Sequence, residues 1–331
     1  MMPSLSEDEL IARFFAPLAG SAGLGLADDA ALLAMPPGHE LVLTTDMLAA
    51  GVHFFADDPP GAIARKALRV NLSDLAAKGA APSGFLLSLG LPQDWTEEWL
   101  AAFAAALGED AKAYACPLLG GDTVRSPAGL TLSITALGAV PDGGMIRRTG
   151  VAEGDLLYVT GTIGDAALGM RLHRGDETDR VWISCLDSAS RTHLRDRYLL
   201  PQPRLGLAEA LRSSARAAMD ISDGLAGDLA KMLRLAGMTA DIGLGDVPLS
   251  DAARQALAQE PDLAATILSG GDDYEVLCAV PPAKAAAFEA LAGQAGIAAT
   301  ALGRARRGDS PPIFRTGRGP VAFSALSYQH F

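Results

Sequence analysis

Short apolar segments typical of buried strands alternate with helix-periodic segments along this 331-residue chain, and that alternation restricts the fold more than any other feature. The predicted strands of the first half are 40–45, 85–91 and 130–140, and the predicted helices between them are 61–78 and 97–114. The strand 40–45 is predicted to be buried, with Asp46 at its carboxyl end. Such alternation predicts an α/β protein of the α+β type, in which helices cover β-sheets.

The turn Pro141-Asp-Gly-Gly144 is the best candidate for a domain boundary, because Pro and consecutive Gly interrupt regular structure. The chain length also favours two domains at roughly 150 residues each. We therefore expect an N-terminal sheet-and-helix domain over 1–141 and a C-terminal α/β sandwich domain over 142–331. Within the second, the charged segment 171–197 predicts exposed helix and loop, and the Arg-rich segment 304–319 predicts loop.

The chain is acidic, with 27 Lys and Arg against 39 Asp and Glu and a formal net charge of −12. Such a charge disfavours nucleic acids and anionic membranes, because both are bound through Lys and Arg. We expect no signal peptide or membrane span, since the apolar stretches are short and interrupted. The three scattered cysteines form no disulfide or zinc pattern, which is typical of a reducing compartment. These features together predict a soluble cytoplasmic protein.

The sequence contains none of the common phosphate-loop, dinucleotide-binding, nucleophile-elbow or zinc-protease motifs. It carries instead a series of Asp residues beside Gly, Thr or Ser at predicted strand ends and turns. Carboxylates and hydroxyls are the ligands that Mg²⁺ prefers. Two carboxylates ~4 Å apart repel by about 4 kcal/mol at an effective dielectric near 20, so a cluster of them needs a cation or raised pKa values. The series comprises Asp28-Asp29, Thr44-Thr45-Asp46, Asn71 to Asp74, Gly120-Gly121-Asp122, Asp220 to Asp223 and Gly270 to Asp273.

Each motif also has a structural interpretation. Asp beside Gly is ordinary turn chemistry, and Ser222 or Asp223 could simply cap the following helix. Asp74, on a polar helix stripe with Asn71 and Lys78, could be solvated. His53 could be a hydrogen-bonded packing residue. Arg147-Arg148 could be surface charge, and Cys116, Cys185 and Cys278 could fill the core.

The order of these motifs resembles the thiamine-monophosphate kinase family, of the superfamily that includes aminoimidazole ribonucleotide synthetase and selenophosphate synthetase. The resemblance covers nearly the whole chain. The motifs that end at His53 and Gly79 are the specific ones, and the Gly-Gly-Asp and Asp-Ile-Ser-Asp motifs are shared more widely. The matching segments are 25–33, 44–54, 66–80, 120–125, 148–150, 154–161, 220–225, 270–275 and 328–331.

The resemblance implies ATP-dependent, Mg²⁺-assisted in-line transfer of a phosphoryl group to thiamine monophosphate. It implies that Asp46, Asp122 and Arg148 are catalytic, that Gly121, Asp122, Arg148 and Ser222 contact ATP, and that His53, Asp272 and Tyr328 contact thiamine monophosphate. The metal ligands that it implies are Asp29, Thr44, Thr45, Asp46, Asp74, Asp122, Asp220 and Asp223. It also implies a homodimer joined through the N-terminal domain, with the C-terminal domain closing over the cleft.

Three positions depart from the family pattern. Ala27 replaces a usual Gly, Asp272 replaces a usual Glu with a reach about one methylene shorter, and the last motif reads Ser-Tyr-Gln-His-Phe around Tyr328. Two alternatives stay open on sequence alone. The chain could be another enzyme of the superfamily with a different phosphate or oxygen acceptor, or a Mg-ATP-binding protein without turnover. An enzyme that forms an aspartyl-phosphate intermediate is a weaker alternative.

Overall fold

A computed structural model of the chain describes residues 5–327. The chain divides into two compact units, and the division falls between Gly143 and Gly144. The first unit contains the residues up to Leu75 and then Ala80–Gly143. The second contains Ala76–Gly79 and the chain from Gly144 onward. Each unit is described below by itself.

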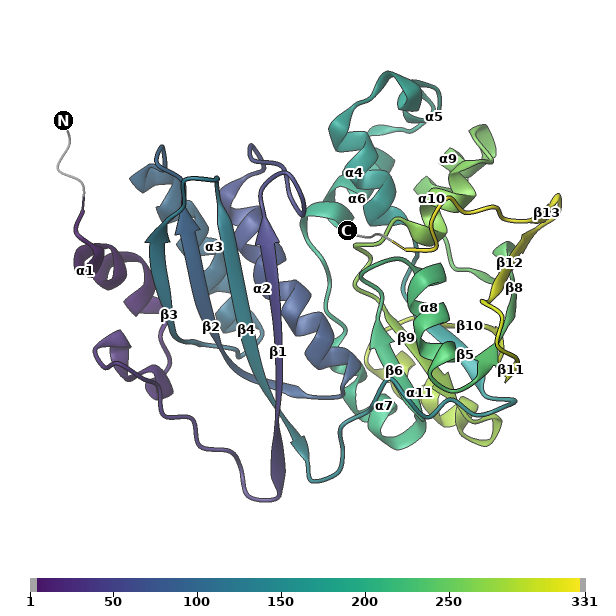
Figure 1. Ribbon diagram of the computed structural model, residues 1–331, viewed down its shortest axis with the longest axis horizontal. Helices are drawn as coiled ribbons and strands as arrows, with labels where there is room; N and C mark the ends of the chain where they lie inside the picture. Colours follow the sequence, from purple (N-terminus) through teal and green to yellow (C-terminus); the bar gives the residue numbers. More distant parts are fainter. Residues whose placement is uncertain (1–4, 328–331) are drawn as a thin grey trace. The chain divides into compact units, whose positions relative to one another are not determined.

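The first unit is built on a four-stranded sheet in the order β1-β4-β2-β3 (Figure 1). Strands β2 and β3 are parallel, and the other two pairings are antiparallel. Two helices cover one face of this sheet, and fully buried Leu68, Leu72 and Leu75 confirm the apolar stripe predicted for the first of them. The elements are β1 (His39–Ala49), α2 (Pro60–Ala77), β2 (Ala81–Leu91), α3 (Glu97–Ala113), β3 (Leu118–Arg125) and β4 (Thr131–Pro141).

The helical segments before the sheet begin at α1 (Glu7–Leu10), where Ser6 and Glu9 form a reciprocal capping box. The chain then continues through short turns of other helical types, which are η1 (Ile11–Phe15), η2 (Ala16–Leu18) and η3 (Ser21–Leu26).

The prediction that the first strand is buried was wrong. Only alternate residues of β1 face the helices, and Leu41, Leu43 and Met47 on the other face are 42%, 60% and 64% exposed. The reason is that β1 is an edge strand of a sheet covered by helices on one face only. The strand also continues to Ala49, so Asp46 lies inside it rather than at its end.

The second unit contains a four-stranded sheet in the order β10-β5-β9-β6 with a hydrophobic core on each face. Every residue of Val276–Val280 is buried, as expected for a strand covered on both sides. Helices α4, α8, α9 and α10 contribute to one core, and α7 and α11 contribute to the other. The strands are β5 (Leu156–Thr160), β6 (Ala217–Asp220), β9 (Val276–Val280) and β10 (Ala299–Arg304).

The α-helices of this unit are α4 (Asp165–Arg174), α5 (Arg180–Ser184), α6 (Ser188–Leu199), α7 (Ala208–Ser214), α8 (Leu225–Arg234), α9 (Asp251–Gln259), α10 (Leu263–Ser269) and α11 (Ala285–Gln294). Single short turns are η4 (Glu177–Asp179), η5 (Leu205–Leu207), η6 (Leu244–Asp246) and η7 (Pro282–Lys284). Small strands complete the unit, namely β7 (Met238–Thr239), β8 (Asp241–Gly243), β11 (Arg306–Arg307), β12 (Ile313–Thr316) and β13 (Gly319–Pro320).

The predictions for this unit were right only in part. The segment 171–197 is helix and loop with most of its residues exposed, as predicted, but some of its side chains are buried. In the segment 171–197, Asp179 is fully buried against Arg171, and Trp182 is buried with it. The segment 304–319 is not all loop, because it contains β11, β12 and the start of β13. Arg306 and Arg315 there both bind Asp241. Of the cysteines, Cys116 and Cys278 fill the core as expected, but Cys185 is exposed.

No helix within residues 5–327 is long and apolar enough to span a membrane.

One buried ionic group of the second unit makes stability depend on pH. Asp165 accepts hydrogen bonds from His193 (2.9 Å), Thr162 and Ser250. The bond with Asp165 raises the pKa of His193 above its ordinary value, although partial burial opposes the charge. Burial also opposes the charge of Asp165, but the three hydrogen bonds outweigh it and lower the pKa of that carboxyl.

The raised pKa of His193 means that protonated His193 stabilises the fold fully below the unfolded-state value near 6.5 and that this contribution disappears as the pH rises through the folded-state value. We expect the wild type to lose about 0.5 kcal/mol more stability between pH 6 and pH 9 than a His193→Asn variant, the scale of a solvent-screened pair. Urea unfolding at both pH values measures this, with exposed His39→Asn as the control. Equal losses in wild type and His193→Asn would contradict the assignment.

Candidate functional site

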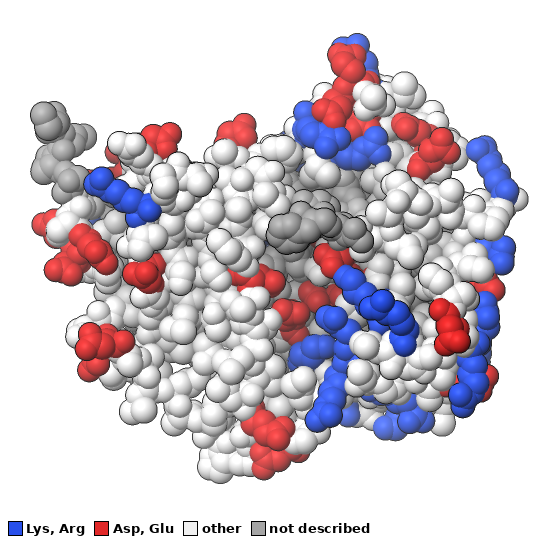
Figure 2. Space-filling view, viewed as in Figure 1, with Lys and Arg blue, Asp and Glu red and all other residues white. Residues whose placement is uncertain are grey.

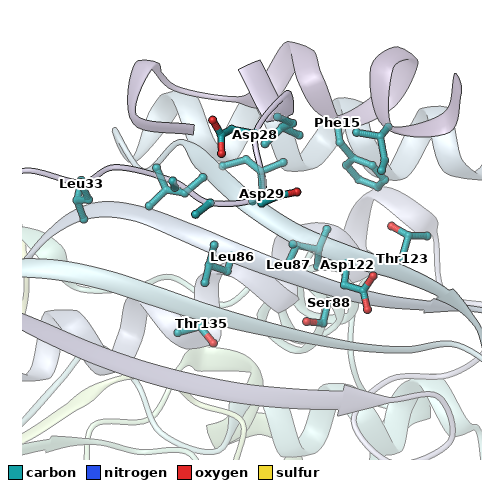
Figure 3. Close-up of a pocket in the computed structure, with 18 of the residues that line it drawn as sticks. Phe15, Asp28, Asp29, Leu33, Leu86, Leu87, Ser88, Asp122, Thr123 and Thr135 are labelled. Atoms are coloured by element: carbon teal, nitrogen blue, oxygen red, sulfur yellow. The ribbon is translucent and has the colours of Figure 1, made fainter. Parts of the chain in front are cut away.

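A cavity of about 670 Å³ lies in the first unit, between the segment that follows η3 and strands β2 and β3. Its lining includes three residues predicted for metal or ATP binding, namely Asp29, Gly121 and Asp122. Figure 3 shows Ser88 and Thr123 beside Asp122, and Asp29 across the cavity from the sheet. The structure therefore brings together residues that are more than 90 positions apart in the sequence.

Gly121 belongs to β3. The Gly-Gly-Asp pattern had indicated a turn at this position instead. A Cβ atom at this position would lie 1.9 Å from the carbonyl oxygen of Leu87 on β2. Only glycine fits so close to a neighbouring backbone, which explains why a glycine precedes Asp122.

A second group of predicted ligands lies on the helix-covered face of the same sheet. The hydroxyl of Thr44 donates to the carboxylate of Asp74 on α2. The backbone N–H of Asp46 donates to Asn71 Oδ1 (3.0 Å), and Asn71 Nδ2 donates to Ala67 O (3.0 Å). Asp74 is thus partly buried and bonded to β1, so the interpretation of Asp74 as a solvated charge was wrong. Asn71, on the same polar stripe, is fully buried.

Thr45 points to the opposite, open face, where its hydroxyl accepts from Thr135 (3.1 Å) and donates to Ile134 O (3.1 Å). Asp122 is also far from Asp46, because β1 and β3 are the two edges of the sheet. Two strands separate Asp122 from its counterpart Met47 on β1, a distance of roughly 14 Å at about 4.8 Å per strand. The first unit does not gather its predicted ligands at one point.

His53 follows β1 and is partly buried. Its Nδ1 atom accepts a hydrogen bond from the backbone N–H of Ala49 (3.1 Å), so the ring orients the end of the strand. This contact agrees with the structural interpretation, and its role toward substrate stays a prediction.

In the second unit, the predicted residues Asp220, Ser222 and Asp223 lie at the end of β6 and in the loop that leads to α8. The prediction that Ser222 or Asp223 caps this helix was wrong, because Gly224 occupies the N-cap position with no side-chain cap. Instead, a side chain of the helix accepts hydrogen bonds from the backbone of the preceding loop. Asp228 Oδ2 accepts hydrogen bonds from the backbone N–H groups of Ser222 (3.1 Å) and Asp223 (3.0 Å).

The loop Gly270–Glu275 packs directly on this first loop. The N–H of Asp272 donates to Ser222 O (2.8 Å), and the N–H of Tyr274 donates to Ile221 O (2.8 Å). The Tyr274 hydroxyl then donates to Asp272 Oδ1 (3.1 Å). A predicted ATP contact, Ser222, and a predicted substrate contact, Asp272, are therefore neighbours, and Asp272 adopts a left-handed backbone with φ of 64°.

Sequence reasoning missed the residues that anchor the second loop. Glu275 is fully buried and accepts from Arg197 (2.8 Å), Arg204 Nε (2.6 Å) and Thr160 (2.6 Å). Asp273 accepts from the N–H of Gly164 (2.9 Å). Burial raises the pKa of the Asp273 carboxyl well above its ordinary value, an effect that Arg197 only partly offsets. The sequence signal was Asp and Glu flanking Tyr274 in a segment that continues into a buried strand.

The remaining predicted residues are less constrained. Arg148 is exposed, and the neighbouring Arg147 carbonyl accepts from the N–H of Ala218 on β6 (2.9 Å). Tyr328 lies outside the described residues. Among residues 5–327, no three His, Cys, Asp or Glu side chains are placed together so as to hold a metal ion. Convergence of the full predicted ligand set stays a prediction.

Comparison with known proteins shows the family. The AIR synthase related protein N-terminal domain matches residues 27–140, and the corresponding C-terminal domain matches residues 152–313. The thiamine-monophosphate kinase of Caulobacter vibrioides is 40% identical over 330 residues, covering 98% of this chain and 91% of the relative. A crystal structure of thiamine-monophosphate kinase from Stenotrophomonas maltophilia is 36% identical, with a TM-score of 0.79 over 90% of this chain and 91% of that one.

A third relative is AaThiL complexed with AMPPCP and TMP, which is 27% identical with a TM-score of 0.75 over 100% of this chain and 99% of that chain. The chain belongs to the AIR synthase-related family and, within it, to the thiamine-monophosphate kinases, which confirms the resemblance seen in the motifs. The E. coli hydrogenase maturation protein HypE, at 21% identity and a TM-score of 0.76, shares the fold.

The close approach at Gly121 gives a test of the cavity's construction. A Gly121→Ala variant places a methyl group against Leu87 O, so β3 must shift away from β2. We expect a loss of about 1–3 kcal/mol in the free energy of unfolding, as for other overpacked sites. The neighbouring Gly120→Ala is the control, since its Cβ would meet only the Leu86 side chain at 3.4 Å. Equal stability of the two variants in urea unfolding would contradict the geometry.

Proposed function

We propose that this chain transfers the γ-phosphoryl group of ATP to thiamine monophosphate, giving thiamine diphosphate and ADP. The observation that carries the proposal is similarity to thiamine-monophosphate kinases over 98% of the chain, together with the relative complexed with AMPPCP, an ATP analogue, and TMP. The cavity lined by Asp29, Gly121 and Asp122 supports it, because these residues were predicted to serve ATP and its metal.

Mg²⁺ fits the residues present. Each predicted ligand offers a carboxylate or hydroxyl oxygen, and Thr44 and Asp74 already lie in contact. The residues that would hold Mg²⁺ ions lie in separate places. They are Asp29 and Asp122 in the cavity, Thr44 and Asp46 on β1 with Asp74 on α2, Thr45 on the open face, and Asp220 and Asp223 in the second unit. When bound, Mg²⁺ neutralises phosphate charge and aligns the transferred group.

The residues of the chain position the substrates rather than move protons. The acceptor is a phosphate monoester with a second pKa near 6, already an anion at pH 7, so no general base is needed. Arg148 supplies fixed positive charge toward phosphate. Gly121 allows a close backbone approach beside Asp122, and Ser222 lies against the loop that carries Asp272.

We also propose that the chain forms a homodimer through the open face of the first unit's sheet. Leu41, Leu43 and Met47 project from this face, and Leu86 on β2 is 39% exposed. Figure 2 shows few charged side chains across it, although the chain as a whole is acidic. An apolar face with few charges favours a partner, and a second copy offers the same surface in return.

Activity is tested with the purified chain, ATP, Mg²⁺ and thiamine monophosphate, with thiamine diphosphate detected by chromatography. Asp122→Asn and Asp46→Asn should lower turnover at least a thousandfold while leaving the melting temperature within a few degrees, because a carboxylate ligand of the phosphoryl-transfer metal is lost. Exposed Asp251→Asn serves as the control. Chelation of Mg²⁺ should also abolish product formation. Near-normal rates in either site variant would remove that residue from the site.

The dimer is tested by light scattering. We expect a mass twice the 34.1 kDa of the chain for the wild type and a shift to monomer for Leu43→Asp, which places charge among the exposed apolar residues of this face. Val181→Asp is the matched control, since Val181 in the second unit is 64% exposed, close to the 60% of Leu43. A monomeric wild type, or dissociation by both variants alike, would contradict the interface.

A further inference from the structure

The loop between β6 and α8 is fixed almost entirely through its backbone. The N–H of Ile221 donates to Glu275 O (2.8 Å), and the carbonyls of Ile221 and Ser222 accept from the loop of Tyr274 and Asp272. The N–H groups of Ser222 and Asp223 both donate to one oxygen of Asp228. The conformation of the two residues predicted to serve nucleotide and metal thus depends on this carboxylate.

Asp228 lies in the first turn of α8 and is only 1% exposed. Its carboxylate faces back toward the N-terminal end of the helix, where it interacts favourably with the helix dipole. Hydrogen bonds from N–H groups to an ionised carboxylate are about twice as strong as neutral ones. Asp228 therefore has the burial, the charge and the direction to hold the loop, although no substrate-contacting role is assigned to it.

Lys231 completes the arrangement one turn further along α8. Its Nζ atom binds the second oxygen of Asp228 (3.0 Å) and also the carboxylate of Asp223. Lys231 therefore compensates the buried charge of Asp228 and fixes the side-chain direction of Asp223. The backbone and the side chain of Asp223 are both linked to the same pair of helix residues.

We propose that Asp228, with Lys231 as its counter-ion, is a positioning residue that holds Ser222 and Asp223 in the conformation that receives the Mg-nucleotide. This inference rests on the proposed function, because it assumes that Ser222 and Asp223 meet nucleotide and metal. Asp228 acts through the backbone N–H groups of the loop and touches no substrate.

The test compares variants that keep or remove the acceptor oxygen. Asp228→Asn retains an oxygen for both N–H groups, whereas Asp228→Leu has similar size and no acceptor. Asp179→Leu is the matched control, since Asp179 is equally buried and paired with Arg171, in another part of the second unit. The measurements are amide hydrogen exchange at Ser222 and Asp223, calorimetric binding of Mg-ADP, and the KM for Mg-ATP beside kcat.

In Asp228→Leu, we expect exchange at both amides and the dissociation constant of Mg-ADP each to rise about tenfold, the scale of lost hydrogen bonds to a charged group. The KM for Mg-ATP should rise in parallel, by a larger factor than the factor by which kcat falls. Asp228→Asn should stay within about threefold of wild type, and Asp179→Leu should lose stability without weakening Mg-ADP. Protected amides or unchanged Mg-ADP binding in folded Asp228→Leu would overturn the proposal, as would equal weakening in Asp179→Leu.

If Asp228→Leu does not fold, Asp228→Ser replaces it, because the shorter side chain cannot reach both N–H groups and leaves more space. The same increases in exchange and in the Mg-ADP dissociation constant are expected, and their absence overturns the inference. Failure of the proposed function is recognised separately, because the wild-type chain would then make no thiamine diphosphate. The hydrogen-exchange and Mg-ADP measurements would still test whether Asp228 holds the loop.

Discussion

Several acidic side chains in and around the candidate site accept hydrogen bonds from neutral donors on neighbouring elements, and the candidate site depends on that arrangement. Thr44 donates to Asp74 across β1 and α2, and Gly164 donates its N–H to Asp273. Asp228 accepts hydrogen bonds from two backbone N–H groups of the loop before α8. Because donors approach each carboxylate from defined directions, a chain with a formal charge of −12 can place its carboxylates accurately despite their mutual repulsion.

Much of the fold could be predicted from local pattern, and the errors have physical causes. The leucine stripe of α2 identified a helix with one buried face, as the structure confirms. An unbroken apolar run cannot reveal whether both faces of a strand are covered, so β1 was predicted to be buried. Strand β3 was missed because Gly120-Gly121-Asp122 has the composition of a turn, while the pairing that makes it a strand depends on Leu87 more than 30 residues earlier.

The candidate site was predictable as a set of residues, whereas its arrangement was not. Motif order placed Asp29 and Asp122 among the ligands, and the cavity brings both to one place. Which ligands face the helices and which face the open side depends on strand register, as Thr44 and Thr45 illustrate. The role of Asp228 was not predicted, because an Asp within a helical pattern gives no sign that it accepts hydrogen bonds from the preceding loop.

Strand register also bears on how the proposed metal ions are distributed. Asp122 and the predicted ligands on β1 lie on opposite edges of one sheet, roughly 14 Å apart, which is beyond a Debye length of about 8 Å in physiological salt. An ion on either edge would therefore do little to neutralise the other edge, and on the proposed function each group of carboxylates would need its own cation. This separation favours several Mg²⁺ ions over one shared ion. On the proposed function, a chain so acidic could accept a triphosphate because the cations would enter in separate places, each beside oxygens already oriented by the fold.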